Sequence, residues 1–129
     1  MSPPSETRIL VIDDEADVRE MVRVLLTRAG YTVDTSGNLS EIVASLLVGR
    51  YDLLTVDLKM PEIDGQDIAE LAKAVNQQIP IIVISGFLTP DLKKQLEDMG
   101  VRHFVNKPFK PDQLLQTVVD GLSGSPHTV

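Results

Sequence analysis

Five short apolar segments alternate with longer amphipathic segments along the chain. The apolar segments are RILVI at 8 to 12, YTVDT at 31 to 35, DLLTV at 52 to 56, PIIVI at 80 to 84 and VRHFV at 101 to 105. Runs of this length, rich in β-branched and aliphatic residues, predict buried β-strands. The first and fourth runs are almost entirely aliphatic, which is typical of strands covered on both faces of a sheet.

Apolar residues at helical spacing follow each of these segments. They predict helices over 16 to 29, over 39 to 48 with Asn38 as the N-cap, around 68 to 75, from Thr89 and Pro90 to Gly100, and from Pro111 to Leu122. The fourth helix offers only Leu92, Leu96 and Met99 to the core, so we expect it to be the most weakly anchored.

Strict alternation of strand and helix favours parallel strands joined by right-handed crossovers. We therefore predict an α/β fold, a three-layer α/β/α sandwich around a five-stranded parallel sheet. A length of 129 residues with 43% hydrophobic content indicates one domain, which we place at residues 7 to 122. Small residues and proline predict a disordered tail at 1 to 6 and a tail or linker stub at 123 to 129.

Composition excludes several classes of protein. The sequence has no cysteine, so a disulfide framework and a thiolate metal site are ruled out, and a reducing cytoplasm is the expected location. A net charge of −7 without a basic stripe argues against direct nucleic-acid binding. The apolar runs are too short to cross a membrane.

Polar residues gather where the predicted strands end. Asp13 and Asp14 follow the first strand, Asp57 the third, Ser85 the fourth and Lys107 the fifth. The carboxyl ends of parallel strands share one edge of the sheet, so these side chains are expected to converge there. Carboxylates suit a hard divalent cation, and a cation with a lysine would offset their repulsion, which points to phosphoryl transfer.

Four motifs at these strand ends resemble the receiver domain of two-component response regulators. They are VIDDE at the first strand, TVDLKMPEIDG from Thr55 to Gly65, VISG at the fourth strand and FVNKPF at the fifth. Each motif is weak alone, but the ordered set is specific. The resemblance covers residues 7 to 122 and implies a flavodoxin-like strand order of 2-1-3-4-5.

The resemblance also implies a function and a role for each matching residue. Asp57 would be the phosphoacceptor for a histidine kinase or phosphotransfer protein in a two-component system or phosphorelay, and the domain would catalyse this transfer and slow autodephosphorylation itself. Asp13, Asp14, Asp57 and the backbone carbonyl of Lys59 would bind Mg²⁺ or Mn²⁺. Lys107 would pair with the acceptor, Ser85 and Phe104 would form the switch pair, and Pro108 would follow a cis peptide bond.

The output surface implied by the family is the face made by the fourth helix, fifth strand and fifth helix. It would bind a downstream protein or output domain, or form a phosphorylation-dependent homodimer. We expect Lys93, Lys94, Gln95 and Arg102 to be exposed there.

Other interpretations stay open for single residues. Glu15 and Asp17 are interpreted as acids that favour the dipole of the first helix, and Phe104 is as consistent with the core as with a switch. His103 and His127 are expected to face solvent or lie in disordered chain, without a ligand role. Lys59 and Phe87 depart from the commoner family pattern and could alter the lifetime of a phosphorylated state.

Three other functional classes fit the sequence less well. A mononucleotide binder would need a glycine- and serine-rich loop after the first strand, where this chain has acids. An aspartyl phosphatase would need a second acid at the position of Lys59. The serious alternative is a degenerate receiver that acts by constitutive protein contact, although such proteins usually lack one of the acids or the lysine.

Overall fold

The computed structural model describes residues 6 to 57, 65 to 75, 78 to 86, 88 to 124 and 127 to 128. Its strands are β1 (Arg8–Ile12), β2 (Thr32–Ser36), β3 (Leu53–Asp57), β4 (Ile81–Ser85), β5 (His103–Asn106) and β6 (His127–Thr128). Its helices are α1 (Ala16–Arg28), α2 (Leu39–Val48), α3 (Gly65–Val75), α4 (Pro90–Asp98) and α5 (Pro111–Ser123). The five predicted strands and five predicted helices are all present.

All strand pairs in the sheet are parallel, and the strand order is β2-β1-β3-β4-β5-β6. The predicted order 2-1-3-4-5 is confirmed. The two-residue strand β6 was not predicted, because a histidine and a threonine among small residues carry no apolar pattern. It pairs with β5 in the register His103 to His127, so the sheet extends one strand beyond the five predicted.

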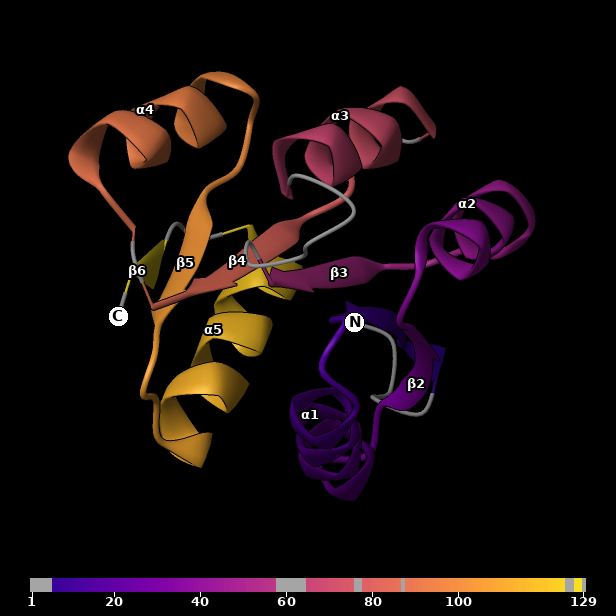
Figure 1. Cartoon of the computed structure of the whole chain (residues 1–129). Coiled ribbons are helices and arrows are strands. Elements are labelled where there is room, and N and C mark those ends of the chain that lie inside the picture. The colour runs from indigo at the N-terminus through magenta and orange to yellow at the C-terminus, as the bar shows by residue number, and fades with distance from the viewer. Residues whose placement is uncertain (1–5, 58–64, 76–77, 87, 125–126, 129) are drawn as a thin grey trace.

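Helices cover both faces of the sheet, with α1 and α5 on one side and α2, α3 and α4 on the other (Figure 1). Alternation within β1 supplies both layers of core. Ile9 and Val11 belong to the cluster that contains the α1 and α5 residues Val22, Leu26, Leu114 and Val118. Leu10 and Ile12 belong to the cluster with α2, α3 and α4 residues, which include Ile42, Ala72 and Leu96. The predicted three-layer sandwich follows from this two-sided burial.

Local sequence signals fix several helix ends. The Asn38 side chain accepts a hydrogen bond from the Glu41 N–H at 2.9 Å, and the Thr89 hydroxyl accepts from the Leu92 N–H at 3.2 Å. Gly30 and Gly100 have φ values of 100° and 98°, the left-handed conformation that ends α1 and α4. These caps confirm the predicted starts of α2 and α4.

Most strands begin one residue later than predicted, and β5 begins two residues later. Val101 is still part of the turn after α4, because its N–H donates to the Leu96 carbonyl at 2.9 Å. At the other end, Asp57 and Ser85 remain in the ladder, in register with Ile84 and Asn106 respectively. Two polar residues expected just after strands are therefore their last members.

The expected exposure of His103 is wrong, because its exposed fraction is 3%. His103 lies in β5 between β4 and β6, and its ring is near Gly121 of α5. Its neighbour Phe104 belongs to the opposite core cluster. Since both faces of the sheet are covered, consecutive residues of β5 are buried regardless of polarity.

Gly121 allows α5 to approach β3 closely. A Cβ atom added at Gly121 would lie 3.0 Å from Leu53 Cδ1, which is closer than carbon atoms normally pack. We expect Gly121→Val to lower the free energy of unfolding by about 1 to 3 kcal/mol through overpacking, measured by urea denaturation. Gln116→Val introduces the same side chain at an exposed position of α5 and should change the stability by less than about 0.5 kcal/mol. Equal losses in the two variants would contradict the close approach.

Candidate functional site

The carboxyl edge of the sheet brings Asp57 and Lys107 together. Asp57 ends β3 with an exposed fraction of 2%, and Lys107 follows β5 directly. The Lys107 ammonium donates a hydrogen bond to Asp57 Oδ2, and the two side chains form an ion pair. Lys107 is itself fixed through its backbone, whose N–H donates to the Ser85 carbonyl at 2.9 Å. The predicted convergence of Asp57, Ser85 and Lys107 is present in the structure.

The charge on Lys107 is maintained by its acidic neighbours. Partial burial lowers the pKa of its ammonium, but the hydrogen bond and charge of Asp57, with the charges of Asp13 and Glu15, outweigh burial and raise the pKa above its usual value. Lys107 therefore stays a cation at neutral pH, and it can hold a negative group at Asp57.

Asp13 is held against Asp57 by three main-chain contacts. Its Oδ1 accepts a hydrogen bond from the Glu15 N–H at 2.9 Å, and its own N–H donates to the Ser36 carbonyl at 3.2 Å. The Arg19 guanidinium donates to the Asp13 carbonyl at 2.8 Å, which ties α1 to the end of β1. Asp13 is buried.

Burial and a like charge raise the pKa of Asp13 to about 6. Burial is the larger cause, the Glu15 N–H and Lys107 oppose it, and the charge of the adjacent Asp57 adds to it. The carboxylate is therefore poorly compensated near neutral pH without a cation.

Three carboxylates could hold a metal ion among the described residues. One oxygen each from Asp13, Glu15 and Asp57 lies within 4.8 Å of the others, and we refer to these three residues as the acidic cluster. The neighbouring Asp14 has a buried Oδ1 atom with no hydrogen-bond partner in the described structure. Oxygen ligands and an unsatisfied buried acceptor fit a hard divalent cation such as Mg²⁺.

The predicted metal ligands agree with this cluster in part. Asp13 and Asp57 belong to it, whereas Asp14 lies outside it and Lys59 lies outside the described residues. For Glu15, the sequence predicts only an acid that favours the dipole of the first helix. It occupies the N-cap position of α1 but its side chain makes no cap hydrogen bond, which leaves the carboxylate free to face Asp13. A run of adjacent acids was the available signal, but it did not show which of their carboxylates lie close to Asp57.

The predicted switch pair is buried in this structure. Ser85 has an exposed fraction of 3% at the end of β4, and Phe104 has an exposed fraction of 1% in β5. Phe104 is thus part of the core, one of the two interpretations left open. The Lys107–Pro108 peptide bond is cis, as the resemblance implied.

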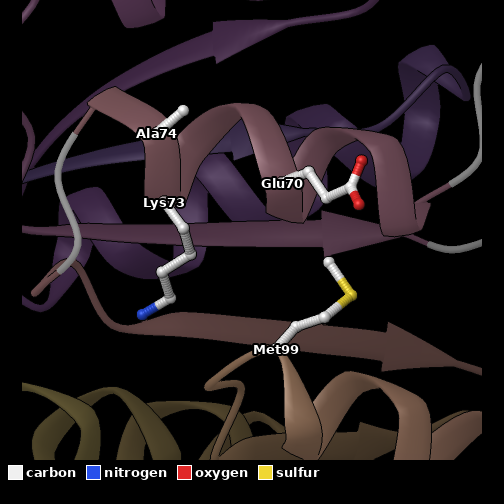
Figure 2. A pocket seen from close by; sticks show the side chains of 4 residues that line it. All are labelled: Glu70, Lys73, Ala74 and Met99. Carbon is white, nitrogen blue, oxygen red and sulfur yellow. The ribbon is translucent and has the colours of Figure 1, made fainter.

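A pocket of about 320 Å³ lies away from the acidic cluster, between α3 and the end of α4. Figure 2 shows its lining, which consists of Glu70, Lys73, Ala74 and Met99. The Lys73 ammonium donates to the Ile79 carbonyl at 2.6 Å, and burial, followed by the charge of Arg102, lowers its pKa. The amine already has a main-chain acceptor, so the pocket adds nothing to the chemistry of the site.

Comparison with known families shows to which protein family the chain belongs. Residues 9–119 match the family described as response regulator receiver domain. The chain belongs to this family. Receiver domains are regulatory phosphoacceptors that act with histidine kinases and output domains, so this receiver domain serves phosphorylation-dependent signalling.

Curated relatives include longer regulators. The transcriptional regulatory protein ResD of Bacillus subtilis is 33% identical over 118 residues, which are 92% of this chain and 49% of ResD. The phosphate regulon transcriptional regulatory protein PhoB of Pseudomonas aeruginosa is 33% identical over 109 residues, 83% of this chain and 48% of PhoB. The receiver domain spans about half the length of these relatives.

Solved structures of similar chains share the architecture. The chemotaxis response regulator CheY4 of Vibrio cholerae has a TM-score of 0.83 and 28% identity, covering 90% of this chain and 98% of CheY4. The response regulator TrrA of Thermotoga maritima, solved in complex with Mg²⁺–BeF, has a TM-score of 0.79 and 31% identity, covering 90% of this chain and 99% of TrrA. None of the helices in the described part of the chain combines the length and apolar character that crossing a membrane requires.

The raised pKa of Asp13 makes a prediction about stability. A carboxyl whose folded pKa is about 6 instead of 3.8 contributes stability that is fully present below pH 3.8 and is lost as the pH rises through about 6. Asparagine at position 13 keeps an oxygen for the Glu15 N–H but carries no charge. Without divalent cations at pH 8, Asp13→Asn should therefore raise the free energy of unfolding by roughly 1 to 2 kcal/mol, after allowance for solvent screening.

Urea denaturation at pH 4 and pH 8 in a chelating buffer measures this effect. The gain should disappear near pH 4, where wild-type Asp13 is protonated, and should shrink at pH 8 when Mg²⁺ is added. Asp17→Asn removes one charge from the exposed first turn of α1 and serves as the control, without a comparable gain. A variant no more stable than wild type at pH 8 would show that the Asp13 charge is well compensated.

Proposed function

We propose that this receiver domain is a phosphorylation-activated switch in which Asp57 accepts a phosphoryl group from a histidine kinase or phosphotransfer protein. The observation that carries the proposal is the buried Asp57 carboxylate, which faces the Lys107 ammonium and two further carboxylates at one edge of the sheet. An aspartate with no role beyond solvation in a loop would be exposed to water and would not be buried against a lysine and other carboxylates.

The acidic cluster would hold Mg²⁺ or Mn²⁺. Asp13 and Asp57 are the ligands that both the resemblance and the described geometry support. Asp14 is next to Asp13 in the sequence, and its Oδ1 atom, which has no hydrogen-bond partner, would provide a further oxygen. The carbonyl of Lys59, which lies outside the described residues, stays part of the proposed ligand set. When bound, the cation supplies positive charge that offsets the carboxylates and the incoming phosphoryl oxygens.

The chemical step makes one bond and breaks one. A carboxylate oxygen of Asp57 attacks phosphorus, the bond between phosphorus and the donor atom breaks, and the donor leaves with that electron pair. Lys107, already bound to Asp57 Oδ2, remains beside the product as a charge-assisted donor to the phosphoryl oxygens. Hydrolysis of the acyl phosphate by water returns Asp57 and inorganic phosphate, which is the proposed slow autodephosphorylation. Lys59 and Phe87, proposed to alter its rate, lie outside the described residues.

The signal would leave through Ser85 and Phe104 to the face formed by α4, β5 and α5. The Ser85 carbonyl accepts a hydrogen bond from the Lys107 N–H, and Lys107 follows β5 directly. Phe104 lies in β5, so this strand connects the site with the output face. Lys94, Gln95 and Arg102 are exposed on it, while Lys93 is half-buried. Shifting a two-state equilibrium from mostly off to mostly on needs about 5 kcal/mol, which several charge-assisted hydrogen bonds could supply.

Strand β6 changes the shape of this face. Its pairing with β5 places the edge of the described sheet at His127 and Thr128 instead of at β5. A downstream protein, an output domain or a second copy that docks here would therefore meet β6 together with α4 and α5. The proposed partners remain the same, but the proposed surface includes this additional strand.

Exposure to a small acyl phosphate tests the acceptor. With Mg²⁺ and acetyl phosphate, intact mass should show one added phosphoryl group on wild type and none on Asp57→Asn. Lys107→Met should reduce uptake by about 10²-fold or more, because it removes the ammonium that faces the developing charge. Asp52→Asn, an exposed aspartate just before the same strand, is the matched control and should be modified normally. An unmodified wild-type protein would favour the degenerate receiver.

Amide hydrogen exchange tests the output face. Addition of phosphoryl to Asp57 should change exchange rates in residues 88 to 105, because Leu96 is the buried residue of α4 and we expect so weakly anchored a helix to open more readily than the core strands. Residues of β2, which lie at the opposite end of the strand order, serve as the internal control and should be unaffected. Changes confined to the loops around Asp13 and Asp57 would contradict a signal leaving through this face.

A further inference from the structure

The ring of Phe104 has a cation above it. Lys93 Nζ, from α4, lies 5.5 Å from the centroid of the Phe104 ring, within the range of a cation–π interaction. The ring is almost fully buried and Lys93 is half-buried, so water screens this contact less than it would at the surface. The next residue, Lys94, is exposed.

Phe104 is held by core packing, since its side chain lies in the buried cluster on the α4 side of the sheet. The phenyl ring has no hydroxyl group, so only packing and the electrostatics of its face can hold it. From α4, the same cluster includes the buried Leu96, and Leu92 packs partly against it. The contact from Lys93 adds an electrostatic interaction to this packing between α4 and β5.

We propose that Lys93 is a positioning residue that keeps the Phe104 ring buried before any phosphoryl group is present. The ammonium binds the negative face of the ring and the ring fills the space beneath α4, so the positions of α4 and Phe104 change together. The coupling to signalling rests on the proposed function, whereas the holding of the ring does not. In this protein the aromatic member of the switch pair thus begins in the inward position, and phosphorylation acts mainly on what surrounds it.

Three substitutions separate charge from packing. Lys93→Met keeps a long apolar stem and removes the charge, and Lys93→Arg keeps a cation able to stack on the ring. Lys94→Met removes one charge from the neighbouring exposed position and serves as the matched control. The chain has three phenylalanines, so ring-¹³C-labelled phenylalanine gives three sets of aromatic signals, and a Phe104→Leu variant identifies those of Phe104.

The first measurement is the relaxation of the Phe104 ring signals by a soluble gadolinium chelate, in the unphosphorylated protein. We expect little relaxation in wild type and in Lys94→Met. In Lys93→Met the ratio of inward to outward ring should fall about fivefold, the effect of losing a typical cation–π contact, and Lys93→Arg should restore it. The proposal is overturned if Lys93→Met behaves like wild type, since the stem alone would then suffice, or if Lys94→Met has the same effect.

The second measurement is the rate of phosphoryl uptake from acetyl phosphate with Mg²⁺. If the inward ring belongs to the receptive state, the rate in Lys93→Met should fall in proportion to its measured inward population, and Lys93→Arg should recover it. An exposed ring with an unchanged rate would overturn the coupling. Absence of uptake in wild type would instead contradict the proposed function and leave the ring measurement standing.

Discussion

The structure depends on one electrostatic constraint, which is that two carboxylates, Asp13 and Asp57, are buried beside each other at the carboxyl edge of the sheet. Asp13, Glu15 and Asp57 converge there, and Lys107 is the cation that bonds to Asp57. Buried like charges are costly, and the raised pKa of Asp13 shows where that cost falls. A protein folded only for stability would gain by replacing one acid, so the arrangement makes sense as a site that is completed by a cation and that gives a phosphoryl group a place prepared for its charge.

The fold holds this constraint in place because the acids come from the centre of the sheet. Asp13 follows β1 and Asp57 ends β3, and these two strands pair with each other in the middle of a sheet covered on both faces. Neither backbone can relax outward without disrupting both core clusters. Lys107, by contrast, follows the more peripheral β5 and reaches the site through a main-chain bond to Ser85. The fixed half of the site thus carries the acids, and the half nearer the sheet edge carries the cation and the residues proposed to respond.

Much of this could be predicted from the sequence, because the alternation of short apolar runs with helical periods determines a parallel sheet, and the end of each strand then determines the edge where functional residues gather. Details that depend on side-chain direction could not. Glu15 differs from Asp14 by one position in an acidic run, and only the geometry of the turn shows that its carboxylate joins the cluster. The burial of His103 could not be predicted from its polarity. In a strand covered by helices on both faces, a polar residue is buried because of the elements packed around it. Strand β6 has no hydrophobic signal, since its pairing is made by backbone.

The residues of β5 offer a route by which a change at Asp57 could reach the helices on both faces of the sheet. Phe104 and His103 point to opposite layers, toward the α4 side and toward Gly121 of α5, so a small displacement of β5 is felt on both faces at once. On one face the displacement meets α4, whose Lys93 lies over the Phe104 ring. On the other it meets α5, where His103 would lie 3.8 Å from a Cβ atom added at Gly121, an ordinary packing distance. Four residues of α5 are buried, whereas Leu96 is the buried residue of α4. The more weakly anchored α4 is therefore the element through which a change at Asp57 that reaches β5 should chiefly be expressed.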